Sequence, residues 1–306
     1  MPVRRIPSPK APTPIAREAL NDASPLVRYI KFPQLLSFLK DELVFTQIDK
    51  LRGLNDPQEG REIADPVVID TLIEENTLDT GEWTDFVEQC AEAKALLGSK
   101  PMTGPYPPHI VAMAFHAFIR KRRAVSCWFS NRFESAAMWA TYGAEVAVCM
   151  ELKGLCDTLD EKSDIIVAEV RYRNRDKATI TLDNYENFQH IGLRPYLVKG
   201  REFRHEHEVR FVTRCPAIFE SPLVVRAPGL ALNIRKVIIS PYLPIPDAVQ
   251  LKKLVENLFT KQNSKANKTE VVYSAINQPE IERYLASVAV DRLAKEYISD
   301  IDNFAL

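Results

Sequence analysis

"AVSCWFSNRFESAAMWATYG", residues 124–143, contains the change from strand to helix on which the fold class depends. Its first seven residues alternate in the manner of a strand, and a short helical pattern follows. Asn131 is a candidate N-cap, because Glu134 stands three residues later as in a capping box. Gly143 is a natural stop for the helix. The stretch therefore predicts a strand that passes directly into a helix starting after Asn131.

Outward from this stretch, strand-like and helical segments are mixed along the whole chain. On the C-terminal side, apolar runs of strand type are "VAVCMEL", "IIVAEVRY", "HEVRFVTR", "PLVVRA", "KVIISPY" and "EVVYSAI". "DAVQLKKLVENLF" and "PEIERYLASVAVDRLAKEYISDI" have helical spacing. On the N-terminal side we expect strands at 26–32 and 43–48, with a helix between them whose first turn holds Pro33.

The predicted fold class is α+β, with a mostly antiparallel, β-rich core, a helical insertion and a C-terminal helix. Residues 1–25 are rich in proline and are expected to form a flexible arm. Residues 26–275 are predicted to form a single α+β domain with the helical insertion at about 61–123. Residues 276–306 are predicted to form a helical tail.

The composition is that of a soluble globular protein: 46% of the 306 residues are hydrophobic and 26% are charged. A net charge of -1 argues against binding of nucleic acid or membranes driven by overall charge. The basic runs "IRKRR" and "RYRNRDK" still allow a local patch that faces nucleic acid. The five cysteines are dispersed, the stretch "MPVRRIPSPKAPTP" does not have the apolar region expected of a secretory signal, and no apolar run is long enough to span a membrane. We therefore expect a cytoplasmic protein with no membrane partner.

"FRHEHEVRFV", residues 203–212, concentrates ionisable side chains in a segment of strand type. If the whole segment is a strand, His205 and His207 share a packed face with the apolar residues. Glu206 and Glu208 then point together to the other, exposed face with the arginines. Three interpretations stay open: a metal site on the histidines, a strand whose glutamates pair with Arg204 and Arg210, and a carboxylate pair for acid–base chemistry.

Other candidate site residues lie near the opening stretch. Ser126, Trp128 and Ser130 share one face of the predicted strand, and the junction with the helix offers backbone N–H groups to an anion. Trp128, Trp139 and Tyr142 are either core or the walls of an aromatic pocket. Asn55, Asp56 and Glu59 in "LNDPQEG" are explained by turn chemistry. His109 and His116 have no companion ligands, and no metal is expected there.

Several of these pieces, taken in order, resemble a widespread bacterial family catalogued as a domain of unknown function. The motifs are "RYIKF…LVFT…LNDPQEG", "VSCWFSNRFESAAMW", "AEVRYRN", "K…FRHEHEVRFV" and "VIISPYLP". The resemblance runs from Arg28 to about Ser274, apart from 61–123, and it implies no established activity.

A more distant resemblance is to the arginine-type ADP-ribosyltransferases, which share the order of arginine, serine and Glu-x-Glu. This resemblance implies that NAD is bound as a substrate, with Arg28 on its phosphates and Ser126 shaping the nicotinamide pocket. Glu208 would hold the ribose 2′-OH and stabilise the oxocarbenium-like transition state, and Glu206 would orient the acceptor. Tyr29, Trp128 or Trp139 would stack on nicotinamide, with Ser130 and Arg210 completing the cofactor site. The usual Ser-x-Ser is here Ser126-Cys127-Trp128, which departs from the pattern.

Two functions of different classes follow, and whether the chain is an enzyme stays open. The first is an NAD-consuming transferase or glycohydrolase, acting as a toxin or phage-defence effector on a protein or nucleic-acid acceptor. The second is a non-catalytic binding or regulatory module, in which Glu206, Glu208 and Arg210 form a structural network and a protein or nucleic acid is the partner. A metal-dependent hydrolase built on His205 and His207 is a third hypothesis.

Overall fold

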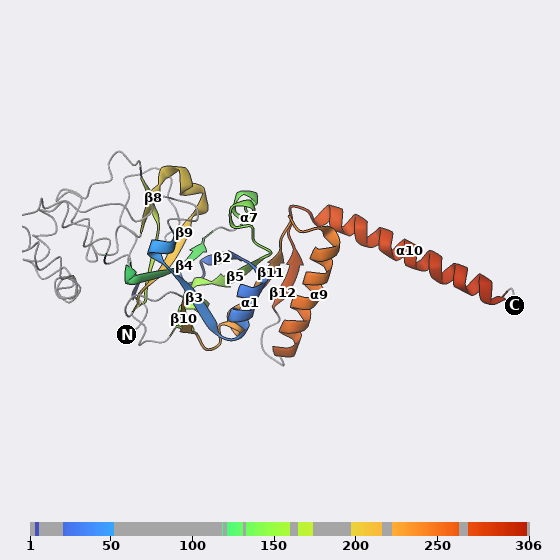
Figure 1. Ribbon diagram of the computed structural model, residues 1–306, viewed down its shortest axis with the longest axis horizontal. Coiled ribbons are helices and arrows are strands. Elements are labelled where there is room, and N and C mark those ends of the chain that lie inside the picture. Colours follow the sequence, from blue (N-terminus) through green and yellow to red (C-terminus); the bar gives the residue numbers. More distant parts are fainter. Residues whose placement is uncertain are drawn as a thin grey trace, which may run out of the picture. The chain divides into compact units, whose positions relative to one another are not determined.

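The computed structural model describes residues 4–5, 21–51, 118, 121–130, 133–159, 165–173, 197–215, 222–262 and 269–304 (Figure 1). The chain folds as two compact units, which interleave along the sequence. The first unit takes Met1–Ser24, Asp41–Ser130 and Leu152–Pro228. The second takes Pro25–Lys40, Asn131–Glu151 and Gly229–Leu306.

The first unit is built on a mostly antiparallel sheet in the order β1-β6-β9-β4-β3-β10. Only β1 runs parallel to its neighbour, β6. The strands are β1 (Arg4–Arg5), β3 (Glu42–Gln47), β4 (Arg123–Phe129), β6 (Ile165–Glu169), β9 (Glu208–Arg214) and β10 (Leu223–Arg226). Around them lie the helices α2 (Ile48–Leu51) and α8 (Leu152–Asp157), the parallel pair β7 (Arg171–Arg173) and β8 (Val198–Gly200), and the 3₁₀ helix η4 (Arg201–Glu206).

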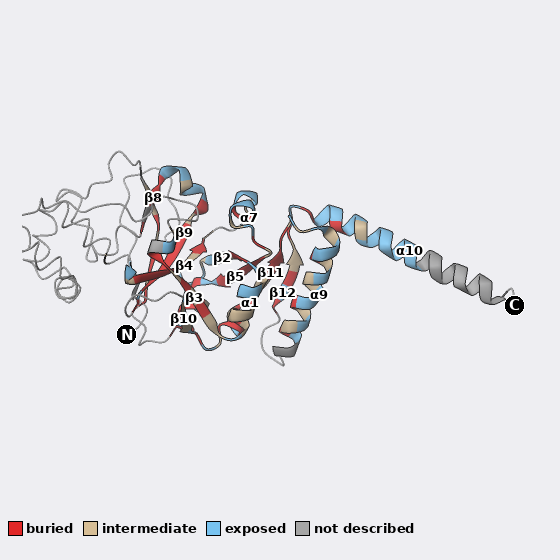
Figure 2. Cartoon of the chain, in the orientation of Figure 1, coloured by how far each residue is buried: buried red, intermediate tan, exposed pale blue. Residues whose placement is uncertain are grey.

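Strands β4 and β9 form the centre of the first unit. Six of the seven residues in each strand are buried, which is why both appear as red arrows in Figure 2. A strand covered on both faces needs a nearly continuous apolar sequence, and "AVSCWF" and "VRFV" supply it. The charged residues Glu208 and Arg210 lie in the buried part of β9, and burial of a charge is costly unless an opposite charge lies beside it.

In the second unit the strands are hydrogen-bonded in the order β2-β5-β11-β12. Its strands are β2 (Pro25–Ile30), β5 (Val146–Glu151), β11 (Lys236–Ile239) and β12 (Glu270–Tyr273). Neighbours are antiparallel except β11 and β12, which run parallel and are connected by α9 (Ile245–Gln262), as parallel strands require a crossover. The unit also contains α1 (Phe32–Leu39), α7 (Ala136–Tyr142), η5 (Ala231–Asn233) and α10 (Gln278–Phe304).

The α+β fold class is confirmed in the described part of the chain, with mostly antiparallel sheets and a C-terminal helix. Pro33 lies in the first turn of α1, as predicted. The helical insertion expected at 61–123 lies outside the described residues, except for Phe118 and residues 121–123, and so do the arm before Asn21 (apart from β1) and the turn "LNDPQEG".

The predicted start of the helix in the opening stretch is wrong. Helix α7 begins at Ala136, and its N-cap is Ser135, whose hydroxyl accepts a hydrogen bond from the Met138 N–H at 3.4 Å. Asn131 lies too far upstream to cap it. Glu134 instead accepts from Ser274 and from the backbone N–H of Ala275, so its carboxylate serves a tertiary contact rather than a capping box. Gly143 ends the helix in a left-handed conformation with φ 49°, as predicted.

The strand predicted in "HEVRFVTR" is confirmed as β9, but the condition of a continuous strand over 203–212, on which the predicted faces depended, does not hold. Residues Arg201–Glu206 form the 3₁₀ helix η4, His207 is left-handed with φ 48°, and the strand begins only at Glu208. The period of two therefore does not apply before Glu208, and the expected faces change. His205 is exposed and His207 is half-buried, whereas Glu206 and Glu208 are buried. The two glutamates are not an exposed pair.

Candidate functional site

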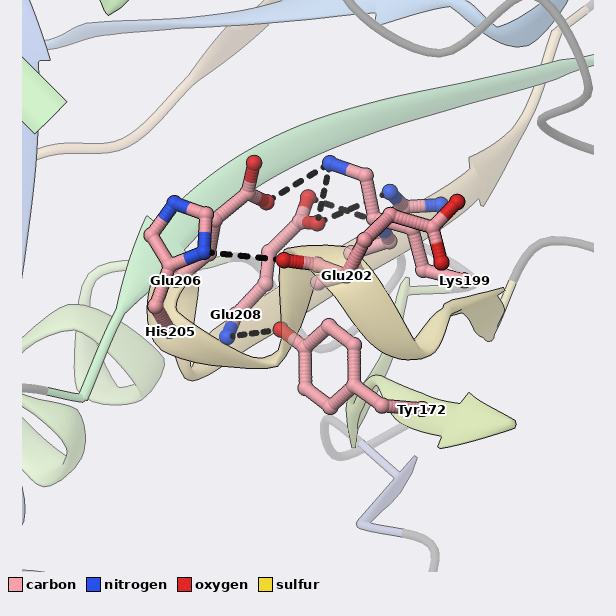
Figure 3. Close-up of polar contacts among 7 residues, drawn as sticks. Tyr172, Lys199, Glu202, His205, Glu206 and Glu208 are labelled. Carbon is pink, nitrogen blue, oxygen red and sulfur yellow. Dashed lines mark hydrogen bonds and ion pairs between the residues drawn. The ribbon is translucent and has the colours of Figure 1, made fainter. Parts of the chain in front are cut away.

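Four charged side chains meet inside the first unit, in a cluster formed by Lys199, Glu206, Glu208 and Arg210. Lys199 lies at its centre: its ammonium is 2.6 Å from Glu206 Oε2 and 3.4 Å from Glu208 Oε2. Figure 3 shows both carboxylates directed at the Lys199 ammonium. The side chains of Lys199 and the two glutamates are only 3% and 1% exposed. Two acids and two bases thus neutralise one another away from water.

Glu208 and Arg210 form the most constrained part of this cluster. They stand two residues apart on β9 and so share a face. Arg210 donates from Nε to Glu208 Oε1 at 2.8 Å and from Nη2 to Oε2 at 2.9 Å, a bidentate arrangement. Lys199 adds a further bond to Oε2, and the Cys127 thiol also donates to this carboxylate. Both oxygens of Glu208 are therefore engaged by protein donors.

The two carboxylates have pKa values shifted in opposite directions. Burial raises the pKa of Glu208, but Arg210 and Lys199 outweigh burial and lower this pKa to about 2. Burial also raises the pKa of Glu206, and here Lys199 opposes the effect without reversing it, while the neighbouring Glu208 charge adds to it. Glu208 is thus ionised at neutral pH, and Glu206 is the member of the cluster that takes up a proton most readily.

Backbone contacts fix the turn that brings Glu206 back onto the cluster. The carbonyl of His207 accepts from the Ser130 N–H at 2.9 Å and from the Ser130 hydroxyl at 3.1 Å. The Glu208 N–H donates to the Tyr172 hydroxyl at 2.8 Å. Tyr172 is paired with Lys199 in the β7–β8 register, so one strand pair supplies both the tyrosine and the lysine.

Ser126 does not join the glutamates, although both belong to the first unit. In the β4–β9 register Ser126 is opposite Phe211, and Glu208 is opposite Phe129. Because side chains alternate along a strand, Ser126 and Glu208 lie on opposite faces of this strand pair. The Ser126 hydroxyl accepts from Trp128 Nε1 at 3.1 Å, and both side chains are fully buried. Trp128 is therefore a core residue.

The remaining residues predicted for an NAD site belong to the second unit. Arg28 lies over the Phe38 ring, with Cζ 5.8 Å from its centroid. Tyr29 packs edge-on against Trp139, with ring centroids 4.8 Å apart. The Tyr29 hydroxyl accepts from the Ser135 N–H, and Trp139 Nε1 donates to Glu134 at 3.2 Å. Tyr29 and Trp139 are 5% and 0% exposed, so both are packed in the core of this unit.

Three residues that contribute to the cluster had no role assigned to them from the sequence: Lys199, Tyr172 and Cys127. Lys199 had a usable signal, because a single lysine in the apolar run "YLVKG" is expected to be buried, and lysine is rarely buried without a partner. Tyr172 and Cys127 had none, since tyrosine and cysteine are ordinary in buried strands.

Metal ligation on the histidines has no support in the described part of the chain. His205 is exposed, and its Nδ1 lies 3.1 Å from the carbonyl oxygen of Glu202. No group of three or more His, Cys, Asp or Glu suited to a metal ion occurs among the described residues. His109 and His116 lie outside the described residues.

No helix in the described ranges has the length and apolar character needed to cross a membrane.

Comparison of the chain with protein-family models, with curated proteins and with solved structures finds no match. The two resemblances drawn from its motifs therefore stay predictions, and the candidate site stands on its own geometry.

Proposed function

We propose that this chain is a non-catalytic binding or regulatory module, and that the Lys199–Glu206–Glu208–Arg210 cluster is a structural core of its first unit. The observation that carries the proposal is the state of the Glu208 carboxylate. It is 1% exposed, and both of its oxygens already accept from Arg210. An NAD-consuming transferase would need this carboxylate to offer an oxygen to a ribose hydroxyl. Saturation by internal donors favours structure over catalysis.

The placement of Ser126 supports the same proposal. The transferase hypothesis requires this serine and Glu208 to line one pocket, but they lie on opposite faces of the β4–β9 pair. The Ser126 hydroxyl is also already bonded to the buried Trp128 indole.

A protein partner fits the described residues better than nucleic acid does. In the basic run that ends at Arg123, that arginine is 5% exposed, and Arg122 lies over the Phe118 ring at 4.4 Å. Of residues 121–123 only Lys121 is exposed, so this part of the run offers few cations to phosphates.

The four described cysteines form no disulfide, which is compatible with a cytoplasmic location.

The test is incubation of the purified chain with NAD, with free nicotinamide measured by chromatography. We expect no release above the blank, and no NAD-dependent rise in the thermal unfolding midpoint. Glu208→Gln should leave this baseline unchanged but lower the stability of the protein. Glu151→Gln is the matched control, because Glu151 is a half-exposed glutamate whose ion pair with Arg235 is 3.7 Å long.

Release of nicotinamide by the wild type, lost in Glu208→Gln but kept in Glu151→Gln, would refute the proposal if circular dichroism shows both variants folded. That result would instead establish the NAD-consuming hypothesis with Glu208 as its carboxylate.

A further inference from the structure

Helix α10 carries a two-turn uncharged segment that is open to solvent. Residues 284–290, "YLASVAV", contain no charged side chain, and we call this segment the collar. None of its residues is buried: Leu285, Val288 and Val290 are 39%, 45% and 63% exposed. Figure 2 shows this part of α10 largely in the colour of exposed residues. A helix that is apolar all round is normally covered, so the collar is a candidate interaction surface.

The charges on either side of the collar show what would cover it. Glu282 and Arg283 precede the collar, and Asp291 and Arg292 follow it. Counted from the central residue Ser287, positions 282 and 292 are equidistant and opposite in charge, and so are 283 and 291. A second copy of the helix running antiparallel and crossing at Ser287 places Arg283 of one copy beside Asp291 of the other, whereas Glu282 and Arg292 lie on the far side of the helix. A parallel pair would place each charge beside its own kind.

The complementary pair Arg283 and Asp291 selects one face of the collar, because both lie on the same side of the helix as Ser287. At 3.6 residues per turn, a single face holds Arg283, Tyr284, Ser287, Val290 and Asp291. In the antiparallel arrangement, Tyr284 of one copy meets Val290 of the other, and Arg283 meets Asp291, each twice by symmetry. Ser287 is small enough to let the two helices approach closely at the crossing. This face also includes Val290, the most exposed large apolar residue of the described part of α10.

We propose that α10 is a self-association surface, on which a second copy of this chain docks antiparallel through the face of Tyr284, Ser287 and Val290. The segment 282–292 carries two acidic and two basic residues, which gives no net positive charge to attract nucleic acid or an anionic membrane. Two helices crossing over so short a segment bury less surface than a permanent dimer needs, so the dimer is weak and reversible. The inference does not depend on the role proposed for Glu208.

Sedimentation equilibrium of the full chain over a wide concentration range tests the proposal. The wild type should show a reversible monomer–dimer equilibrium. Arg283→Glu should raise the dimer dissociation constant by at least about tenfold, because it sets two acidic residues against each other at both ends of the crossing. The double variant Arg283→Glu/Asp291→Arg restores opposite charges and should return the constant to within about threefold of the wild type.

Arg292→Glu is the matched control, since it makes the same charge change on the opposite face of the helix. It should alter the dissociation constant by less than about threefold. Four results would each overturn the proposal: a wild type that stays monomeric at the highest concentration, a double variant as weak as Arg283→Glu, an Arg292→Glu variant as weak as Arg283→Glu, or a dimer unaffected by Arg283→Glu. Circular dichroism shows whether the variants stay folded. We expect that they do, because the substituted residues are exposed.

Discussion

The two glutamates of the buried cluster should respond very differently to the same substitution. Glutamine has the shape of a protonated glutamate, so Glu→Gln approximates the cost of removing the negative charge. A pKa that falls from an ordinary 4.5 to about 2 on folding means that the folded environment favours ionised Glu208 by about 3 kcal/mol. We therefore expect Glu208→Gln to lower the free energy of unfolding by about 3 kcal/mol at neutral pH. This agrees with the usual cost of leaving buried cations without their partner.

Glu206→Gln should cost far less, although Glu206 is just as buried and is only 2.6 Å from Lys199. The pKa of Glu206 is raised, so the folded environment stabilises the charged form of this carboxyl less, relative to its neutral form, than water does. Glu208 also stays in place to face Lys199 and Arg210 in this variant. We expect the free energy of unfolding to change by less than about 1 kcal/mol, with stabilisation as one allowed result.

Urea unfolding at neutral pH, followed by tryptophan fluorescence, measures both variants. Trp128 is fully buried in β4 beside β9, so its emission reports on the region that holds the cluster. The surface control Glu151→Gln should change the free energy of unfolding by less than about 0.5 kcal/mol. The reasoning fails if Glu208→Gln lies within about 1 kcal/mol of the wild type, or if Glu206→Gln is as destabilising as Glu208→Gln.

Three further expectations concern pH, capping and thiol chemistry. The Glu208 contribution is fully present above the unfolded pKa of 4.5 and is lost as the pH falls through the folded pKa of about 2. The difference in the free energy of unfolding between wild type and Glu208→Gln, measured in urea at several pH values, should therefore shrink across that window. Ser135→Ala removes the N-cap of α7 and should cost about 1 kcal/mol by the same assay, whereas Ser135→Gly should cost only a few tenths. Burial raises the pKa of the Cys149 thiol to about 12, so mass spectrometry should find this cysteine alkylated slowly in the native protein and rapidly in urea.

Local sequence patterns predicted many of the strands and the longer helices in the described part of the chain, but not α8, β8 or η4. The apolar runs that become β4, β5, β6, β9 and β11 were identifiable because largely buried strands leave little room for polar residues. The helices α9 and α10 follow from their spacing, and Gly143 ends α7 because it adopts a positive φ at little cost. Asn131 failed as a cap because several residues before a helix offer suitable side chains, and the choice of Ser135 was not visible in the pattern.

The sequence by itself also placed Glu208 beside Arg210, because residues two apart on a strand must share a face. The sequence did not reveal that this strand begins only at Glu208 and does not include Glu206. Ser130, at the end of β4, binds the His207 carbonyl, and the bend at His207 turns Glu206 inward instead of outward. Lys199, which contacts both glutamates, belongs to β8, a strand that pairs with β7 and not with β9. A buried carboxylate is tolerated only where a cation lies within hydrogen-bonding distance of it. The tertiary structure decides which cation this is, because no local sequence pattern indicates which distant side chain will contact the carboxylate.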